Sequence, residues 1–343
     1  MVKPVPCDFD CGRCHLGSSG GIIHREVLKK ICILGRQSGL HTIGEWKFPA
    51  YSGGVQPEED EYAPSIDLVW LIDLFEILGG NSFNNLCSII SSWTDGKLSS
   101  DNLRFIPYAA FEVEVSDPTS KTIYSDLHNL AATRSALKFE VISEVRDMNL
   151  DRAVRIKESA ARFCGTTDMF ILTLEKLQEI LETKGCASTY CSLYERKTRK
   201  VDEVQNKLMS LAAELNLTGK VEFSPPECLA LGNVYTPRLD AAWLTSVPKP
   251  ASSLVSTIEM ECSFKIVRDL CHLTLFGFEC EEETSHKHIA GGVANLSRHS
   301  YIGFLVTPSE KTAVARRIVN KYSLAFGFNN VFVLDKDMIL AGK

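Results

Sequence analysis

The order of apolar and polar positions along the chain is repeated. Residues 25–49 and residues 202–225 each combine an amphipathic helical pattern, a glycine and a short strand that ends at a proline. Residues 64–71 and 237–244 then share a proline, an aspartate and a tryptophan in the same register. These matches predict an internal duplication.

Further matched pairs follow in the same order along the chain. Each repeat therefore predicts a helix, a strand, an aspartate-bearing strand, a Glu-x-Glu strand, and then helix, strand, helix and strand. This order predicts an α/β fold with two tandem units, each a mixed central sheet flanked by helices. The additional pairs are 111–116 (FEVEVS) with 258–263 (IEMECS), 129–141 with 295–306, and 153–176 with 313–336.

The chain has 343 residues, which favours two domains. Residues 183–200 are polar and basic without periodicity, and they predict a linker. Each repeat contains a segment that the other lacks, and the two segments are expected at different places in the fold. They are residues 73–107 in the first copy and residues 264–287 in the second. The expected organisation is a cysteine-rich segment (1–20), a first repeat (21–182), the linker (183–200) and a second repeat (201–343).

Composition narrows the class of protein. Hydrophobic residues make up 45% and charged residues 23%, values typical of a globular chain. No apolar stretch is long enough to span a membrane, and the N-terminus lacks the apolar core of a secretory signal, so we expect a cytoplasmic protein without membrane contact. A homodimer is compatible with the pattern and not required by it.

The net charge of −6 gives no general attraction to nucleic acid. DNA binding would depend on local groups of basic residues. These lie on two predicted basic helices, 152–162 and 311–321, and beside the turns expected at Asn129-Leu130 and Asn295-Leu296. The competing interpretation is that these side chains are solvated helix faces. The candidate nucleic-acid-binding residues are Lys121, Arg134, Arg155, Arg298, Arg316 and Arg317.

Carboxylates carry the candidate chemistry. Alternate residues of a strand share a face, so Glu112 and Glu114 are expected side by side, and burying such a pair is costly unless a cation compensates. Asp67 begins a buried strand and is expected beside them. Three oxygen ligands suit Mg²⁺ or Mn²⁺, which can activate water against a phosphodiester. The second copy has the corresponding set Asp240, Glu259 and Glu261.

These residues, in this order of helices and strands, resemble the PD-(D/E)XK nuclease superfamily, which includes type II restriction endonucleases. The resemblance implies restriction-endonuclease-like units in which Asp67, Glu112, Asp240 and Glu259 bind magnesium. The superfamily's lysine is replaced by glutamate at 114 and 261. We hypothesise that these glutamates orient the attacking water or help hold a second metal ion.

Two further sets of residues have competing interpretations. Glu26 and Glu203 occupy matching positions on the first helix of each repeat, where an acidic residue can lie near the metal or simply favour a helix N-terminus. The N-terminal segment has a compact spacing suited to Zn²⁺ or an iron–sulfur cluster, with free thiols as the alternative. Its residues are Cys7, Cys11, Cys14 and His15.

The sequence thus predicts a divalent-metal-dependent DNA endonuclease, of a restriction or defence type, whose two units act as a pseudo-dimer on duplex DNA. The missing lysines and the acidic net charge favour an alternative, a non-catalytic DNA-binding or assembly module built from degenerate nuclease folds. RNA or branched DNA is a third substrate class.

Overall fold

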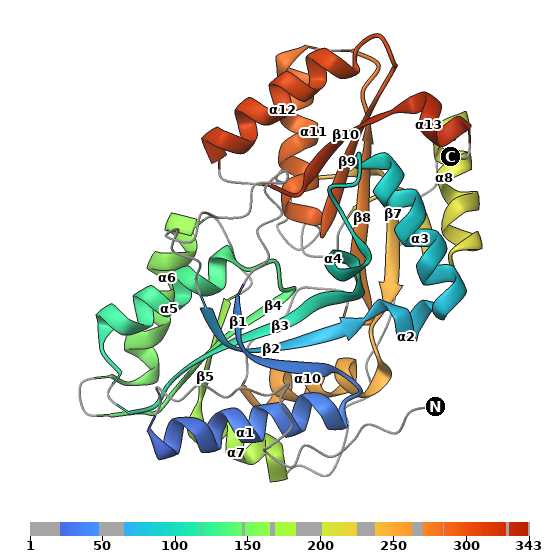
Figure 1. Cartoon of the computed structure of the whole chain (residues 1–343). Helices are drawn as coiled ribbons and strands as arrows, with labels where there is room; N and C mark the ends of the chain where they lie inside the picture. Colours follow the sequence, from blue (N-terminus) through green and yellow to red (C-terminus); the bar gives the residue numbers. More distant parts are fainter. Residues whose placement is uncertain are drawn as a thin grey trace.

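The computed structural model describes ten segments of the chain, which form two five-stranded sheets with helices around them (Figure 1). No helix within these segments is long and apolar enough to cross a membrane. The described residues are 21–47, 65–116, 118–145, 148–164, 169–182, 201–224, 237–262, 270–283, 285–326 and 329–341.

The two sheets have the same topology. The first has the order β1-β2-β3-β4-β5, with antiparallel pairing as far as β3 and parallel pairing beyond it. The second has the order β10-β9-β8-β7-β6 with the corresponding orientations. The predicted fold class, two tandem α/β units with mixed sheets and flanking helices, is confirmed. The strands are β1 (His41–Lys47), β2 (Ser65–Asp73), β3 (Phe105–Glu114), β4 (Leu137–Ile142), β5 (Met169–Thr173), β6 (Thr218–Phe223), β7 (Leu239–Ser246), β8 (His272–Cys280), β9 (Ile302–Thr307) and β10 (Val331–Asp335).

Helices cover both faces of each sheet. In the first unit α1 packs on one face, where the Trp70 Nε1–H donates to the Ile31 carbonyl, and α5 and α6 pack on the other. In the second unit Trp243 donates in the same way to Leu208. These flanking helices are α1 (Ile22–Gln37), α5 (Ser120–Ala132), α6 (Leu150–Cys164) and α7 (Leu174–Glu182), and then α8 (Glu203–Glu214), α11 (His286–His299), α12 (Thr312–Phe326) and α13 (Lys336–Leu340).

The predicted Glu-x-Glu strand of the second repeat is wrong. Residues 258–263 were expected to form it, but Glu259 and Glu261 lie in a helix, α10 (Lys249–Cys262). The reason is the helical spacing of its buried residues Ala251, Val255 and Ile258, which places them on one face. The third strand of the second sheet is β8 instead, so both insertions precede the third strand.

The register of the last matched pair also needs correction. The sequence pairs residue 170 with 330, but Phe170 lies beside Phe139 in the first sheet as Phe332 lies beside Phe304 in the second. The true offset is two residues larger. With it, α6 and α12 correspond along their whole length of 15 residues.

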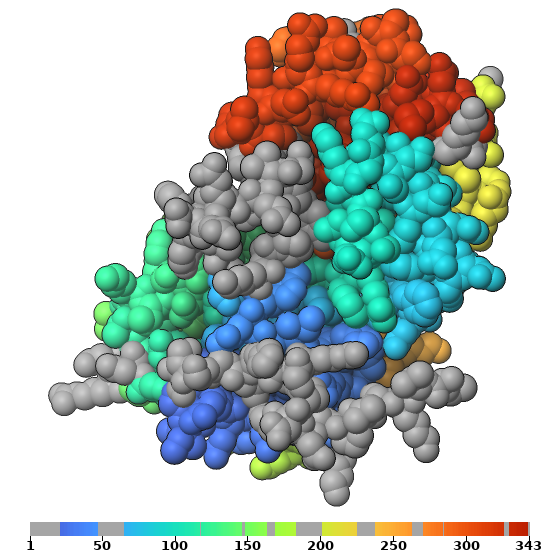
Figure 2. Space-filling model, viewed as in Figure 1, coloured from blue at the N-terminus to red at the C-terminus, as the bar shows by residue number. Residues whose placement is uncertain are grey.

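The inserted helices of each unit pack against the other unit. The first inserts α2 (Leu74–Leu78), α3 (Gly80–Trp93) and α4 (Ser100–Arg104), and the Trp93 ring lies 5.5–6.2 Å from Trp243, Phe278 and Phe304 of the second sheet. Figure 2 shows this segment, in cyan, seated against the second unit. In return α10 packs against α7 of the first unit.

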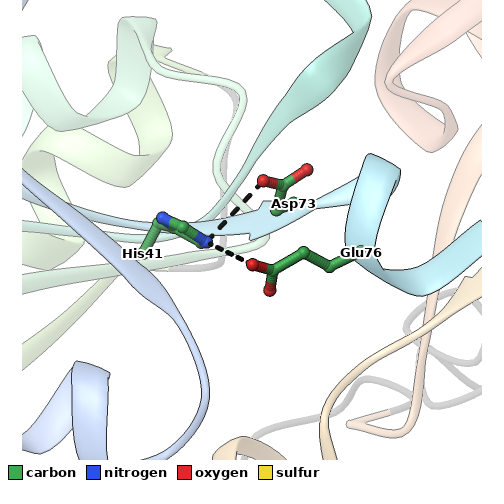
Figure 3. Close-up of side chains that lie close together, drawn as sticks. All are labelled: His41, Asp73 and Glu76. Atoms are coloured by element: carbon green, nitrogen blue, oxygen red, sulfur yellow. Dashed lines mark ion pairs between the residues drawn. The ribbon is translucent and has the colours of Figure 1, made fainter. Parts of the chain in front are cut away.

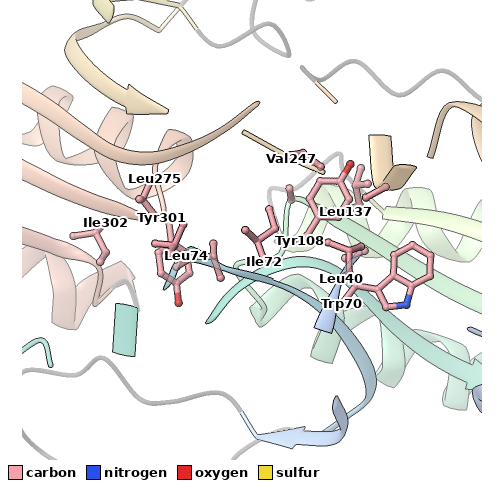
Figure 4. Close-up of a cluster of buried hydrophobic side chains, with 14 of the residues drawn as sticks. Leu40, Trp70, Ile72, Leu74, Tyr108, Leu137, Val247, Leu275, Tyr301 and Ile302 are labelled. Carbon is pink, nitrogen blue, oxygen red and sulfur yellow. The ribbon is translucent and has the colours of Figure 1, made fainter. Parts of the chain in front are cut away.

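The exchange joins the two units through one apolar core. Leu40, Trp70 and Tyr108 of the first unit share a continuous buried cluster with Val247 and Tyr301 of the second (Figure 4). Since hydrophobic stabilisation grows with the apolar area removed from water, the two units support each other. The chain is therefore an interlocked pair of units.

Candidate functional site

Asp67 and Glu112 lie where strands β2 and β3 separate. The antiparallel ladder between these strands ends at the pair Leu68 and Phe111. One residue beyond it, Asp67 Oδ2 accepts a hydrogen bond from the Val113 N–H at 2.9 Å, and the Asp67 N–H donates to Glu112 Oε2 at 3.2 Å. Asp67 thus replaces the missing ladder bonds, and its carboxylate is held beside that of Glu112.

Glu140 adds a second buried carboxyl group to this point. It is paired with Glu112 in the parallel β3–β4 ladder, and the two residues are 0% and 4% exposed. Asn129 Nδ2 donates to Glu112 Oε1 at 3.4 Å, but neither carboxyl oxygen of Glu140 has a hydrogen-bond partner among the described residues. Burial, followed by the neighbouring carboxylates, raises the pKa of both groups well above the usual range.

Asp126 and His24 reach the same place from two helices. Asp126 precedes Asn129 by one helical turn on α5; burial, then the charges of Asp67 and Glu114, raises its pKa to about 7. His24 lies in the first turn of α1, with Nε2 3.2 Å from Asp67 Oδ2. This hydrogen bond raises the pKa of His24.

The first unit therefore gathers five carboxyl groups and one imidazole, which we call the acidic cluster: His24, Asp67, Glu112, Glu114, Asp126 and Glu140. An unpaired buried carboxyl group costs folding free energy, and a bound cation would remove that cost. Oxygen ligands of this kind fit Mg²⁺ or Mn²⁺, which prefer carboxylates and water. The orphaned oxygens of Glu140 are thus the observation that fits a metal ion.

The second unit repeats the hydrogen-bonded frame with different residues from those expected. Asp240 Oδ2 accepts from the Cys280 N–H at 2.7 Å, as Asp67 does from Val113. Asn295 Nδ2 donates to Glu279 Oε1 at 3.0 Å, as Asn129 does to Glu112. The counterparts of Glu112 and Glu114 are therefore Glu279 and Glu281, rather than the α10 residues Glu259 and Glu261.

Three members of the acidic cluster have no counterpart in the second unit. Leu305 takes the place of Glu140, since it pairs with Glu279 in the β8–β9 ladder. Gly292, one turn before Asn295, takes the place of Asp126. The hydrogen bonds from Trp70 to Ile31 and from Trp243 to Leu208 show which residues of α1 and α8 correspond, and they align Glu26 with Glu203. In this alignment α8 begins four residues later than α1, so it lacks the helical turn that carries His24.

The second unit also has a cation near its carboxylates. Arg238 forms an ion pair with Glu222 at 2.8 Å, and its charge opposes the rise in pKa that burial causes at Asp240 and Glu279. Burial is the larger effect, because it raises the pKa of Glu279 to about 9 and that of Asp240 above its usual value. The arginine partly compensates the negative charge that remains.

The other sequence candidates are scattered. Glu26 and Glu203 are exposed, and His24 is the α1 residue beside Asp67. Lys121 and Arg155 line one groove between α5 and α6. The Cys7, Cys11, Cys14 and His15 set lies outside the described residues, as does the linker 183–200.

Two of the candidate DNA-contacting arginines form contacts between the two units. Arg134 donates to the Tyr301 carbonyl at 3.3 Å and to the Asn329 side chain. Arg316 pairs with Asp95 at 3.5 Å. Arg298 and Arg317 are exposed on α11 and α12.

A second group of possible metal ligands lies at the opposite end of β2. His41 Nε2 is 3.7 Å from Asp73 Oδ2 and 3.6 Å from Glu76 Oε1 (Figure 3). Among the described residues, these are the three side chains whose ligand atoms already lie within 4.8 Å of one another. Arg104, however, forms a two-nitrogen ion pair with Asp73 at 3.0 and 3.1 Å, and Asp73 caps α2 through the Phe75 N–H. The group therefore acts as an ion-pair network that fixes α2 to the sheet.

Sequence reasoning found Asp67, Glu112 and Glu114 but missed other members of the acidic cluster. A glutamate within the apolar strand LKFEVI was a usable signal for Glu140, as was the i, i+3 spacing of Asp126 and Asn129. His24 gave no signal, because it reaches Asp67 only through the tertiary fold.

No protein-family model matches the chain, and neither a curated protein nor a solved structure is significantly similar to it.

Proposed function

We propose that this chain is a divalent-metal-dependent endonuclease that hydrolyses phosphodiester bonds in DNA, with its catalytic centre at the acidic cluster of the first unit. The observation that carries the proposal is Glu140, which is fully buried near Glu112 and Asp126 and has no hydrogen-bond partner among the described residues. A structural role would not require so many carboxyl groups in one apolar setting. The resemblance to PD-(D/E)XK nucleases supports the same reaction class by analogy.

Asp67 and Glu112 are the residues that would hold Mg²⁺ or Mn²⁺, with Glu140 and Glu114 beside them. When bound, such an ion polarises the scissile phosphate and lowers the pKa of a water molecule. Val113 and Asn129 orient the two main ligands through their hydrogen bonds. Fixed ligands of this kind need little rearrangement as charge develops.

His24 is the residue that we assign to proton transfer. The superfamily's lysine is replaced here by Glu114, so that position offers no proton-bearing cation. His24 lies at the edge of the cluster, with Nε2 3.2 Å from Asp67 Oδ2, and its imidazole is the group there that can carry a proton. It would supply the positive charge that the glutamate cannot.

The alternative that the sequence left open, a non-catalytic assembly module, suits the second unit. It has leucine and glycine in place of two cluster carboxylates, and it has Arg238 nearby. Its aromatic face also receives Trp93 from the first unit. We therefore propose one catalytic unit and one supporting unit, in place of two cutting sites.

The test uses matched variants of the two units. Asp67→Asn keeps an oxygen that can accept the Val113 bond, and Glu112→Gln keeps the shape of its side chain. With duplex DNA and Mg²⁺ or Mn²⁺, we expect cleavage by the wild type and a loss of at least about 100-fold in both variants. Asp240→Asn and Glu279→Gln should remain within about threefold of the wild type.

Two results would overturn the proposal. One is the absence of cleavage of any nucleic acid by the wild type with any divalent ion. The other is unchanged cleavage by Asp67→Asn and Glu112→Gln. Circular dichroism of each variant shows whether it is folded, so a loss of activity can be separated from a loss of structure.

A further inference from the structure

A basic groove lies between α5 and α6. It has a volume of about 800 Å³. The Arg152 side chain spans it, since its Nη2 donates to Ser120 Oγ at 2.9 Å. The residues that line it are Ser120, Lys121, Tyr124, Arg152, Arg155, Ile156 and Ser159.

The charge of this groove differs from that of the chain as a whole. The protein has a net charge of −6, yet the groove is lined by Lys121, Arg152 and Arg155, with no acidic side chain among its lining residues in the described part of the chain. The N-terminal ends of α5 and α6 add the positive ends of two helix dipoles. Such a surface suits a polyanion.

Its position relates it to the acidic cluster. Glu114 ends β3 and is followed by α5, just as Ile142 ends β4 and is followed by α6. The N-termini of both helices therefore lie at the carboxyl ends of the parallel strands, the edge at which α/β folds usually bind ligands. Asn129 of α5 contacts Glu112, while Tyr124 of the same helix lines the groove. One helix thus separates the two features.

The second unit provides an internal comparison. With the alignment fixed by Asn129 and Asn295, Lys121 corresponds to Lys287 and Tyr124 to Ala290. Along α6 and α12, Arg155 corresponds to Arg317, and Arg152 to Val314. The second unit therefore keeps two of the charges but lacks the aromatic ring and the bridging arginine.

We propose that the groove binds a single-stranded stretch of the nucleic acid substrate, with its phosphates on Lys121, Arg152 and Arg155 and a base stacked on Tyr124. Tyr124 is 37% exposed and lines the groove, so its side chain is accessible to a ligand there. Base stacking on an aromatic ring beside a basic track is the usual means of holding single strands. This inference rests on the proposed function, because the single-stranded nucleic acid bound in the groove would be the substrate that the acidic cluster cuts.

The experiment measures binding without cleavage. A fluorescent 20-nucleotide single strand and its duplex are titrated in EDTA against the wild type, Lys121→Ala/Arg155→Ala, and Tyr124→Ala. We expect the double variant to bind the single strand at least about tenfold more weakly, with a shallower dependence of affinity on salt. Tyr124→Ala should weaken binding of the single strand more than that of the duplex.

The matched control is Lys287→Ala/Arg317→Ala, which removes the same charge at the same positions of the second unit and should bind like the wild type. Equal losses in this control, unchanged binding in the groove variants, or no binding by the wild type would overturn the proposal. Asp67→Asn should bind normally in EDTA but fail to cut in Mn²⁺. Failure of the groove variants alone to show an effect would leave the proposed function standing.

Discussion

The two units share a hydrogen-bonded frame but differ in what the frame surrounds. In both, an aspartate accepts a backbone N–H of the third strand, and an asparagine donates to the buried glutamate. Glu140 and Asp126 then complete the first unit, where the second has Leu305 and Gly292. Because the frame survives without these two carboxylates, they are not needed to build the fold.

The packing around Gly292 shows how far the second unit has departed from the first. A Cβ atom at this position would lie 3.3 Å from Leu305 Cδ1 and 3.5 Å from Glu279 Cβ. A side chain here would therefore require Leu305 to move. Leu305 and Gly292 fill this place in the second unit with apolar packing. Glu140 and Asp126 fill the corresponding place in the first unit with buried carboxyl groups, which costs folding free energy. That cost is the physical basis for assigning function to the first unit.

The largest effect that we predict concerns the contact between the units. Trp93→Ala removes a 2% exposed ring from the aromatic face of the second sheet, and we expect the free energy of unfolding to fall by about 3–5 kcal/mol. Guanidinium unfolding followed by fluorescence and circular dichroism measures it. Trp93→Phe, which keeps an aromatic ring, should lose less. Two separate transitions, with only one of them shifted, would show that the units are not interlocked.

A smaller effect is predicted for Glu140→Leu, which gives the first unit the residue of the second. Burial raises the pKa of Glu140 above 4.5, so the folded state holds its proton more tightly than the unfolded state does. The stability contributed by this group is present below pH 4.5 and is lost as the pH rises. We expect the leucine variant to be about 1–3 kcal/mol more stable at pH 8, with a smaller gain near pH 4.5.

The matched change in the other unit is Leu305→Glu, which should destabilise the protein. Its loss of stability should grow as the pH rises, because the introduced carboxyl group is more costly to bury when it is ionised. Both variants are measured by chemical unfolding in EDTA, so that metal binding does not contribute. A Glu140→Leu variant that is less stable than the wild type at pH 8 would contradict the assignment of Glu140 as an unpaired buried group.

Most of the fold could be predicted from the sequence, because its strands carry clear apolar patterns and the pattern occurs twice. The failure at Glu259 and Glu261 has a physical cause. Residues 258–263 share both glutamates and the serine with the Glu-x-Glu strand at 111–116, but the preceding residues have helical spacing, and the longer pattern decides the structure. Phe278, followed by Glu279 and Glu281, was the better match to the first repeat.

The acidic cluster was less predictable than the fold. Asp67 was found through its true counterpart Asp240, whereas Glu112 was found through a match to Glu259, although its true counterpart is Glu279. Glu140, Asp126 and His24 are absent from the second unit, so a comparison of the repeats discards them. The residues that distinguish a working unit from a supporting one are those that a search for internal repeats overlooks.

We propose that the first unit, and not the second, holds the metal ion. Titration with Mn²⁺, followed by electron paramagnetic resonance, tests it with Glu112→Gln, Glu279→Gln and His41→Ala. We predict binding at least about tenfold weaker for Glu112→Gln, and wild-type affinity for the other two variants. Equal weakening by Glu279→Gln, or unchanged affinity in Glu112→Gln, would contradict the claim.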